Sequence, residues 1–184
     1  MWTEILTAFL FFLPAGLANG IPVIVAKAPL LKKWEFPMDF NKSWRGIRLL
    51  GDHKTMRGLV TGILMAILTA GLLQLWYLND ASLRANMNFN YANVNYIVFG
   101  FISGLGALLG DAFKSFLKRR TSIKPGAAWF PFDQIDYIIG GCLLTALYVR
   151  LNLLSYLLVF ILYFGLHMLS TYVGFLLKFK KQPI

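Results

Sequence analysis

Acidic side chains are scarce in this 184-residue sequence, and three of the eight stand in two neighbouring segments with helical spacing. The first segment carries polar residues at spacings of three, four and seven, which places them on one helix face: Asp111, Lys114, Ser115 and Lys118. In the second segment, Asp133 and Asp136 are three residues apart and also share a face. Two adjacent helices would therefore bring three carboxylates, two lysines and a serine to one place.

Carboxylates in this pattern are suited to a divalent cation. Mg²⁺ is a hard ion that proteins bind with one or two carboxylates together with waters and substrate phosphates. A metal held by carboxylates and surrounded by lysine and arginine is typical of sites for nucleotide polyphosphates. The Walker A pattern GxxxxGK[ST] does not occur in the sequence. A structural alternative stays open, in which the aspartates pair with Lys114, Lys118 or Arg119 and neutralise helix ends.

A second basic segment lies earlier in the chain, from residue 27 to residue 57, and is too long to be only a connection. Its second half, SWRGIRLLGDHKTMRG, alternates three glycines with four basic side chains: Arg45, Arg48, Lys54 and Arg57. Backbone amides freed by glycine bind phosphate well when basic side chains accompany them. The alternative is a basic loop that lies on anionic lipid headgroups.

The composition decides which kind of protein must position these residues. Hydrophobic residues make up 58% of the chain and charged residues 14%, against about 45–50% and about 25% in soluble domains. A net charge of +10 would suggest a nucleic-acid partner in a soluble protein. Here the long apolar runs indicate a membrane protein with basic loops and no nucleic-acid partner. One cysteine, Cys142, excludes an intramolecular disulfide and a cysteine-based zinc site.

Five apolar segments are expected to cross the membrane as helices, each of which needs roughly 20 mostly apolar residues. The predicted spans cover residues 5–26, 58–78, 94–116, 133–150 and 152–177. They form one integral membrane domain over residues 1–184, with cytoplasmic loops at 27–57 and 117–132. The fourth span has the weakest support, because only 13 uncharged residues separate Asp136 from Arg150.

The basic residues support the fourth span and set the orientation. Lysine and arginine mark the cytoplasmic side of a membrane protein, and five spans place 16 of the 18 basic residues on one side. Arg84 and Arg150 fall on the other side. The prediction is therefore an all-α polytopic protein of the cell membrane, with the N-terminus outside, the C-terminus cytoplasmic and the active site on the cytoplasmic side.

Glycines recur at an interval of four residues in the third predicted span. The sequences GFISG (Gly100–Gly104) and GALLG (Gly106–Gly110) are both small-xxx-small patterns. Such patterns allow the backbones of membrane helices to approach closely. We therefore expect this helix to pack tightly against its neighbours.

The stretch GDAFKSFLKRRTSIKPGAAWFPFDQIDYIIGG (Gly110–Gly141) resembles the signature of the CDP-archaeol synthases. These enzymes are archaeal-type relatives of the phosphatidate cytidylyltransferases, which carry the pattern S-x-x-K-R followed by D-x-x-D. The matching residues are Ser115, Lys118, Arg119, Asp133 and Asp136. RGIRLLGDHKTMRG and PAGLANGIPV are similar to the first cytoplasmic loop and first helix of that family, and five spans match as well.

The resemblance implies transfer of a cytidylyl group from CTP to a lipid phosphate, with Mg²⁺ as cofactor. It implies three catalytic metal ligands: Asp111, Asp133 and Asp136. It assigns five residues to the nucleotide phosphates: Lys114, Ser115, Lys118, Arg119 and Lys124. Lys54 and Arg57 would contact nucleotide or lipid phosphate. The expected partners are CTP, membrane lipids and the acceptor 2,3-bis-O-geranylgeranylglycerol 1-phosphate.

Other functions stay open at this level. A phosphatidate cytidylyltransferase would use an ester lipid in place of the ether lipid. A CTP-dependent polyprenol kinase would transfer the γ-phosphoryl group and would need a base for a neutral hydroxyl. A transporter would place carboxylates at mid-span and show inverted repeats, whereas here the acidic residues gather at one face. A passive scaffold would leave the clustered aspartates unexplained.

Overall fold

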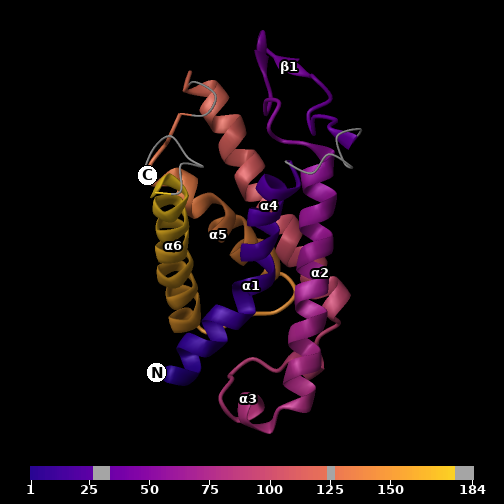
Figure 1. Ribbon diagram of the computed structural model, residues 1–184, viewed down its shortest axis with the longest axis vertical. Helices are drawn as coiled ribbons and strands as arrows, with labels where there is room; N and C mark the ends of the chain where they lie inside the picture. Colours follow the sequence, from indigo (N-terminus) through magenta and orange to yellow (C-terminus); the bar gives the residue numbers. More distant parts are fainter. Residues whose placement is uncertain (27–33, 124–126, 177–184) are drawn as a thin grey trace.

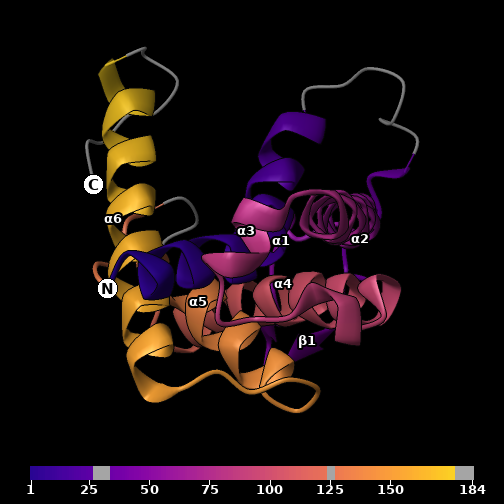
Figure 2. The same cartoon turned by 90° about the horizontal axis from the view of Figure 1, so that it is seen from below.

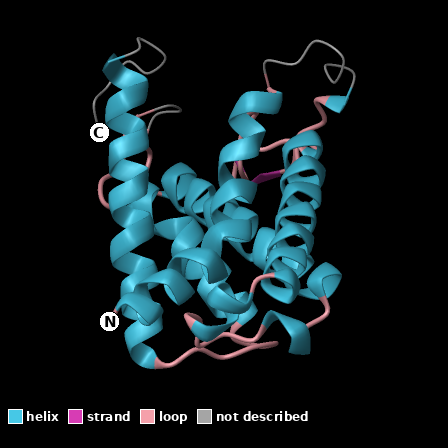
Figure 3. Cartoon of the chain, turned by 60° about the horizontal axis from the view of Figure 1, so that its bottom comes forward, coloured by secondary structure: helices cyan, strands magenta, loops and turns pink. Residues whose placement is uncertain are grey.

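The computed structural model describes residues 1–26, 34–123 and 127–176, which are mostly helical (Figures 1 and 3). The long helices are α1 (Trp2–Val25), α2 (Met56–Asn79), α4 (Tyr96–Arg120) and α6 (Leu153–Leu176). The shorter helical elements are α3 (Ala81–Ala85), η2 (Tyr91–Asn93) and α5 (Phe132–Thr145). An antiparallel pair of two-residue strands, β1 (Ser43–Trp44) and β2 (Ile47–Arg48), lies between α1 and α2.

In the described part of the chain, four helices are long and apolar enough to cross a membrane: α1, α2, α4 and α6. Apolar side chains favour the hydrocarbon core of a bilayer. In that environment every backbone polar group must be paired, and a helix pairs these groups within itself. Side-chain caps define two of the starts, because Thr55 accepts the N–H of Gly58 and Asn95 accepts the N–H of Ile97. α4 continues to Arg120, and the basic residues of its last turn complement the negative end of the helix dipole.

α5 has 14 residues and is shorter than the other membrane candidates. The sequence predicts a membrane segment over residues 133–150, whereas the helix ends at Thr145 and a turn follows it. In that turn, the hydroxyl of Tyr148 accepts the N–H of Asn95 at 3.1 Å. The turn therefore joins the end of α5 to the start of α4.

α4 is the central helix and contacts α1, α2 and α5 (Figure 2). Its two glycine patterns lie on two different faces. Gly100 and Gly104 face α2, where a Cβ added to Gly100 would lie 2.5 Å from a backbone atom. Gly106 and Gly110 face α5, where a Cβ added to Gly106 would lie 2.6 Å from a carbonyl oxygen. The expected close packing is thus present on both sides of α4.

Gly110 controls how closely α4 and α5 approach. We expect Gly110→Ala to lower the free energy of unfolding by about 1–3 kcal/mol, the usual cost of overpacking a close contact. The added methyl group would collide with the carbonyl oxygen of Asp136. Thermal unfolding in detergent measures the effect. The matched control is Gly165→Ala in α6, where nothing lies within 4 Å of the added atom. Equal melting temperatures for the two variants would contradict this prediction.

Polar contacts close the end of the molecule at which α1 begins. The Glu4 carboxylate accepts hydrogen bonds from Asn88 Nδ2 at 2.6 Å, Asn152 Nδ2 at 3.2 Å and Ser155 Oγ at 2.5 Å. These bonds tie α1 to the start of α6 and to the segment between α3 and α4. The opposite end, which carries β1 and β2, holds the aspartates and lysines described next (Figure 1).

Candidate active site

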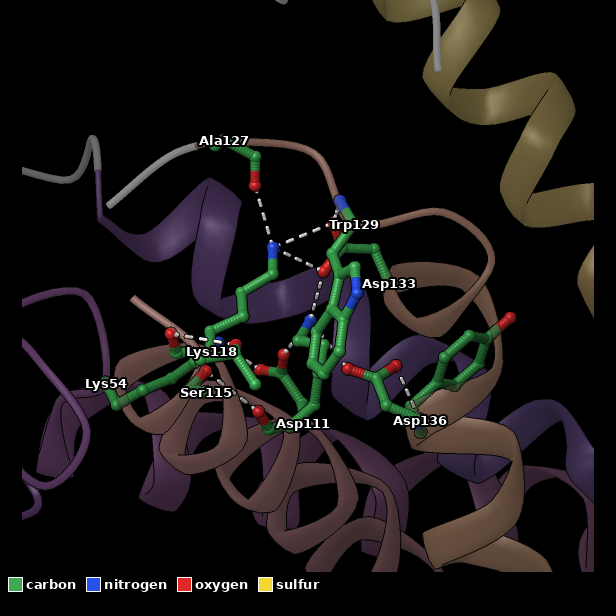
Figure 4. Close-up of polar contacts among 11 residues, drawn as sticks. Lys54, Asp111, Ser115, Lys118, Ala127, Trp129, Asp133 and Asp136 are labelled. Atoms are coloured by element: carbon green, nitrogen blue, oxygen red, sulfur yellow. Dashed lines mark hydrogen bonds and ion pairs between the residues drawn. The ribbon is translucent and has the colours of Figure 1, made fainter. Parts of the chain in front are cut away.

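Three carboxylates converge on the ammonium group of Lys114, and Figure 4 shows how the three aspartates lie. Lys114 Nζ lies 2.7–3.0 Å from one oxygen of each carboxylate: Asp111, Asp133 and Asp136. Asp111 and Lys114 belong to α4, whereas Asp133 and Asp136 belong to the start of α5. The spacing within each helix puts each pair on one face, and the glycine contacts between α4 and α5 bring the two faces together.

Asp133 links the start of α5 to the end of α4. Its Oδ2 accepts the backbone N–H of Trp129 at 2.7 Å and a hydrogen bond from Lys118 Nζ at 2.8 Å. The same ammonium group donates to the carbonyl oxygen of Ala127 at 2.8 Å (Figure 4). A carboxylate in the first turn of a helix is also favoured by the positive end of the dipole. Lys118 and Asp133 therefore fix the segment that leads into α5.

Two buried carboxylate oxygens of the cluster face lysine ammonium groups. Asp133 Oδ1 lies 2.7 Å from Lys118 Nζ and 3.0 Å from Lys114 Nζ, and Asp136 Oδ2 lies 2.7 Å from Lys114 Nζ. The other Asp136 oxygen accepts the backbone N–H of Tyr137 at 2.7 Å. These two oxygens therefore have coordination sites that a cation other than lysine could also use.

The first loop contributes to the cluster through Lys54, whose ammonium group pairs with Asp111 Oδ2. Ser115 donates its hydroxyl to the backbone carbonyl of Asp111 at 2.9 Å. The loop and α4 are 57 residues apart in sequence at this contact. The ion pair therefore closes the first loop over the aspartates.

A polar pocket of about 300 Å³ opens between the first loop and α4. Basic side chains dominate its wall: Arg48, Lys54, Lys114, Lys118 and Arg119. Ser115 and His53 also line it. The basic wall of the pocket suits a phosphate group.

Most of the residues singled out from the sequence lie together here. The ion-paired cluster contains six of them: Lys54, Asp111, Lys114, Lys118, Asp133 and Asp136. Ser115 and Arg119 line the adjoining pocket. Arg57 does not line it; this side chain is buried in the first turn of α2 and pairs with Glu35 at 3.2 Å. Lys124 lies outside the described residues.

Sequence reasoning missed the residues that hold the first loop in place. Asp39 accepts hydrogen bonds from Arg48 Nη2 at 2.9 Å and from the N–H groups of Leu50 and Gly51. Arg120 donates to the carbonyl oxygens of three residues in the strand pair, at 2.9–3.3 Å. Arg120 belongs to the run KRR at the end of a helix, and such a run predicts a phosphate-binding residue as readily as a residue that holds a loop. Asp39 belongs to no periodic pattern, so nothing in the sequence singled it out.

Asp39 is expected to keep the loop ordered over a wide pH range. Burial by itself would raise the pKa of this carboxyl, but donation from Arg48 and three backbone N–H groups holds that pKa well below its usual range. A depressed folded-state pKa means that the stabilisation is complete above the pKa of an unfolded aspartate, about 3.9. It is lost as the pH falls from there through the folded-state pKa.

We therefore expect Asp39→Asn to weaken the loop by roughly 1.5–3 kcal/mol, the usual contribution of hydrogen bonds to a charged group. Hydrogen exchange of the amides in residues 39–52 measures this as faster exchange at pH 7. The wild-type loop should keep its protection down to pH 5, after correction for intrinsic rates. Asp52→Asn is the matched control, because the Asp52 side chain is 80% exposed. Identical exchange in the two variants would contradict the role given to Asp39.

The donor set of the cluster fits a hard divalent ion. Three carboxylates surround one positively charged atom, Lys114 Nζ, which occupies the place of a shared cation. As these side chains stand, the described part of the chain contains no group of three or more His, Cys, Asp or Glu arranged to hold a metal.

An apolar groove of about 410 Å³ runs between α4 and α5 on the other side of the cluster. Exposed apolar side chains form its wall, among them Phe113, Phe132 and Ile139. Two polar residues of the cluster, Lys114 and Asp136, line the same groove. Because Lys114 also lines the polar pocket, the two depressions meet at the aspartate cluster.

Comparisons with known proteins agree on one family. The family model described as CarS-like, CDP-archaeol synthase, matches residues 1–184. The CDP-archaeol synthase of Sulfolobus acidocaldarius is 31% identical over 181 residues, covering 97% of this chain and 98% of that protein. The CDP-archaeol synthase of Sulfurisphaera tokodaii is 34% identical over 181 residues, covering 97% of this chain and 96% of that protein.

A solved structure also matches the fold of this chain. It is described as "Structural insight into an intramembrane enzyme for archaeal membrane lipids biosynthesis". The TM-score is 0.68 and the sequence identity 28%, over 90% of this chain and 93% of that one. The likeness therefore extends over most of both chains.

Proposed function

Because the chain belongs to the CarS-like CDP-archaeol synthase family, we propose that it transfers a cytidylyl group from CTP to a membrane lipid phosphate. The lipid phosphate oxygen forms a bond to the α-phosphorus of CTP, and the bond from that phosphorus to pyrophosphate breaks. The proposed acceptor is 2,3-bis-O-geranylgeranylglycerol 1-phosphate, and the products are a CDP-archaeol-type lipid and pyrophosphate. The reaction prepares this lipid for phospholipid biosynthesis.

The observation that carries the proposal is the position of Lys114 between two unlike depressions. On one side lies a pocket lined by basic side chains, and on the other an apolar groove between α4 and α5. A water-soluble nucleotide matches the first and a lipid tail matches the second. Their reacting phosphates would then meet at Lys114, which suits the joining of two anions.

Charge balance supports Mg²⁺ as the cofactor. In the cluster, three carboxylates face three ammonium groups and neutralise them, so these lysines by themselves offer no net positive charge to a triphosphate. Asp111, Asp133 and Asp136 would hold the ion and release Lys114 toward phosphate. Bound there, Mg²⁺ supplies positive charge to the nucleotide and to the pyrophosphate leaving group.

The residues of the chain then have positional and electrostatic roles. Lys118 and Arg119, both on α4, bind the nucleotide phosphates. Lys54, on the first loop, contacts the same phosphates from the opposite side of the pocket. The attacking phosphate monoester already carries a charge of about −1.5 to −2 at pH 7. It therefore needs little help from a general base, and the main task of the site is to hold two anions in line.

The proposed topology has five membrane segments, with α5 and residues 146–150 as the fourth. α6 begins at the end of the molecule at which α1 begins (Figure 1). α5 and the residues after it therefore lead the chain from the aspartate end back to that end. Among the described residues, the basic side chains at the end of α4 and in the adjoining part of the first loop belong to the aspartate end, whereas Arg84 belongs to α3 and Arg150 shortly precedes α6. By the positive-inside rule the aspartate end is cytoplasmic and the N-terminus is outside.

The test uses purified protein in detergent with labelled CTP and Mg²⁺. It is offered the two-chain ether lipid phosphate, phosphatidic acid or a polyprenol, in parallel. We expect CDP-lipid and pyrophosphate in equal amounts, with the ether lipid preferred. Preference for phosphatidic acid would overturn the substrate assignment. Release of CDP together with a polyprenyl phosphate would show a kinase and overturn the proposed reaction.

A further inference from the structure

Arg120 ends α4, and its guanidinium group faces the strand pair of the first loop. Nη1 donates to the carbonyl oxygen of Trp44 at 2.9 Å, and Nη2 donates to the carbonyl oxygens of Ile47 and Arg48 at 3.3 and 3.2 Å. Arg119, its neighbour in α4, lines the polar pocket, whereas Arg120 does not. The function proposed above gives Arg120 no role.

Two aromatic rings hold the guanidinium group in this direction. The rings of Trp44 and Phe116 are stacked, with centroids 6.2 Å apart and an interplanar angle of 15°. Arg120 Cζ lies 5.2 Å from the centroid of the Trp44 ring and 4.8 Å from that of Phe116, which is one turn earlier in α4. A planar guanidinium group can stack on rings and donate several hydrogen bonds in fixed directions, which the point charge of a lysine cannot do. One side chain therefore joins the end of α4 to the strand pair.

The strand pair leads directly into the loop wall of the polar pocket. β2 ends at Arg48, whose side chain lines the pocket and donates to Asp39. Asp39 also accepts the N–H groups of Leu50 and Gly51, and both of these residues line the pocket. The same wall continues to Lys54. A shift of β2 relative to α4 would therefore move Arg48 and Lys54 away from the α4 side of the pocket.

We propose that Arg120 is a positioning residue for the nucleotide, because it fixes the strand pair against α4 and so keeps Arg48 and Lys54 facing the phosphates of CTP. This inference rests on the proposed function and adds to it a residue that sets the affinity for CTP without touching it. The aspartates of the cluster belong to α4 and α5, so their positions do not depend on the strand pair. Loss of Arg120 therefore weakens the binding of CTP more than it slows the chemical step, and KM for CTP rises while kcat changes little.

The experiment uses the full-length protein in detergent with Arg120→Lys, which keeps the positive charge but cannot replace the fork of donors. KM for CTP is expected to rise at least about tenfold, the factor that corresponds to one lost hydrogen bond to a charged group. Both kcat and KM for the lipid phosphate should stay close to wild type, and hydrogen exchange of the amides in residues 43–48 should become faster. Arg84→Lys is the matched control, because Arg84 Nη1 also donates to two carbonyl oxygens, at the other end of the molecule (Figure 1). This variant keeps the wild-type KM for CTP.

A second variant separates positioning from direct binding of phosphate. Trp44→Leu removes the ring on which Arg120 stacks and keeps the carbonyl oxygen, and Trp44 does not line the polar pocket. If Arg120 acts through the strand pair, Trp44→Leu also raises KM for CTP, and the double variant has a smaller effect than the product of the two single effects. Unchanged exchange in residues 43–48, or effects that multiply in full, would show that Arg120 binds phosphate itself and would overturn the proposal. A fall in kcat with an unchanged KM for CTP overturns it as well.

Direct binding of labelled CTP, measured by equilibrium dialysis, keeps this test separate from the function on which it rests. If the wild-type protein binds CTP but forms no CDP-lipid, the proposed function fails, and Kd for CTP in the Arg120→Lys protein still decides the role of Arg120. If the Arg120→Lys protein does not fold, Trp44→Leu decides the matter, since Trp44 is 51% exposed. An unchanged Kd for CTP in the Trp44→Leu protein then overturns the proposal.

Discussion

Asp133→Asn is expected to lower the rate of CDP-lipid formation by about 10³-fold, because several kcal/mol of charge stabilisation are lost with one metal carboxylate. Asparagine keeps the shape of the side chain and can still accept the N–H of Trp129. It removes the negative charge that faces Lys114 and Lys118. The loss should therefore fall mainly on kcat, in a protein that still folds but melts at a lower temperature because Lys118 and Lys114 lose a charged partner.

Asp80→Asn is the matched control for this variant. Asp80 caps the short helix α3 at the other end of the molecule, where it accepts the N–H of Leu83. Asparagine serves equally well as a helix cap, so this protein should keep wild-type activity and stability. A folded Asp133→Asn protein with more than half of the wild-type activity would remove Asp133 from the catalytic group.

The resemblance seen in the sequence is confirmed by the comparisons, and much of the site was accessible from spacing alone. Intervals of three residues on a helix placed Asp111 with Lys114, and Asp133 with Asp136. Spacing within a helix says nothing about the register between helices. That register depends on Gly106 and Gly110, whose lack of a side chain lets α5 approach. The convergence of three carboxylates on one ammonium group therefore needed coordinates.

The features that the sequence did not predict are those without a period. A strand of two residues is too short to show an alternation of apolar and polar side chains. The sequence therefore did not predict the β1–β2 pair or the residues that hold it, Asp39 and Arg120. The apolar groove is hidden for a different reason. In a membrane helix, a side chain that faces lipid and one that faces a neighbouring helix are equally apolar. Hydropathy therefore cannot separate exposed Phe113 from buried Leu108 on the same helix.

Lys114→Met is expected to make the stability of the protein depend on Mg²⁺. Removal of the ammonium group leaves three carboxylates facing one another with no shared cation: Asp111, Asp133 and Asp136. Loss of one partner from a buried ion pair costs about 3–5 kcal/mol, so the melting temperature should fall in the presence of a chelator. Millimolar Mg²⁺ should restore much of it, because in the proposed function the same carboxylates would hold the ion.

Thermal unfolding in detergent, with chelator or with Mg²⁺ at matched ionic strength, separates this role from a purely structural one. The Lys114→Met protein should gain more stability from Mg²⁺ than the wild type, in which the lysine competes for the same oxygens. Lys42→Met, at an exposed position in the first loop, should respond to Mg²⁺ as the wild type does. If Lys114→Met gains no more than Lys42→Met, the three aspartates do not form a metal site, and their role is to pair with lysine. Because this readout does not use catalysis, it tests the cofactor assignment independently of the choice of lipid.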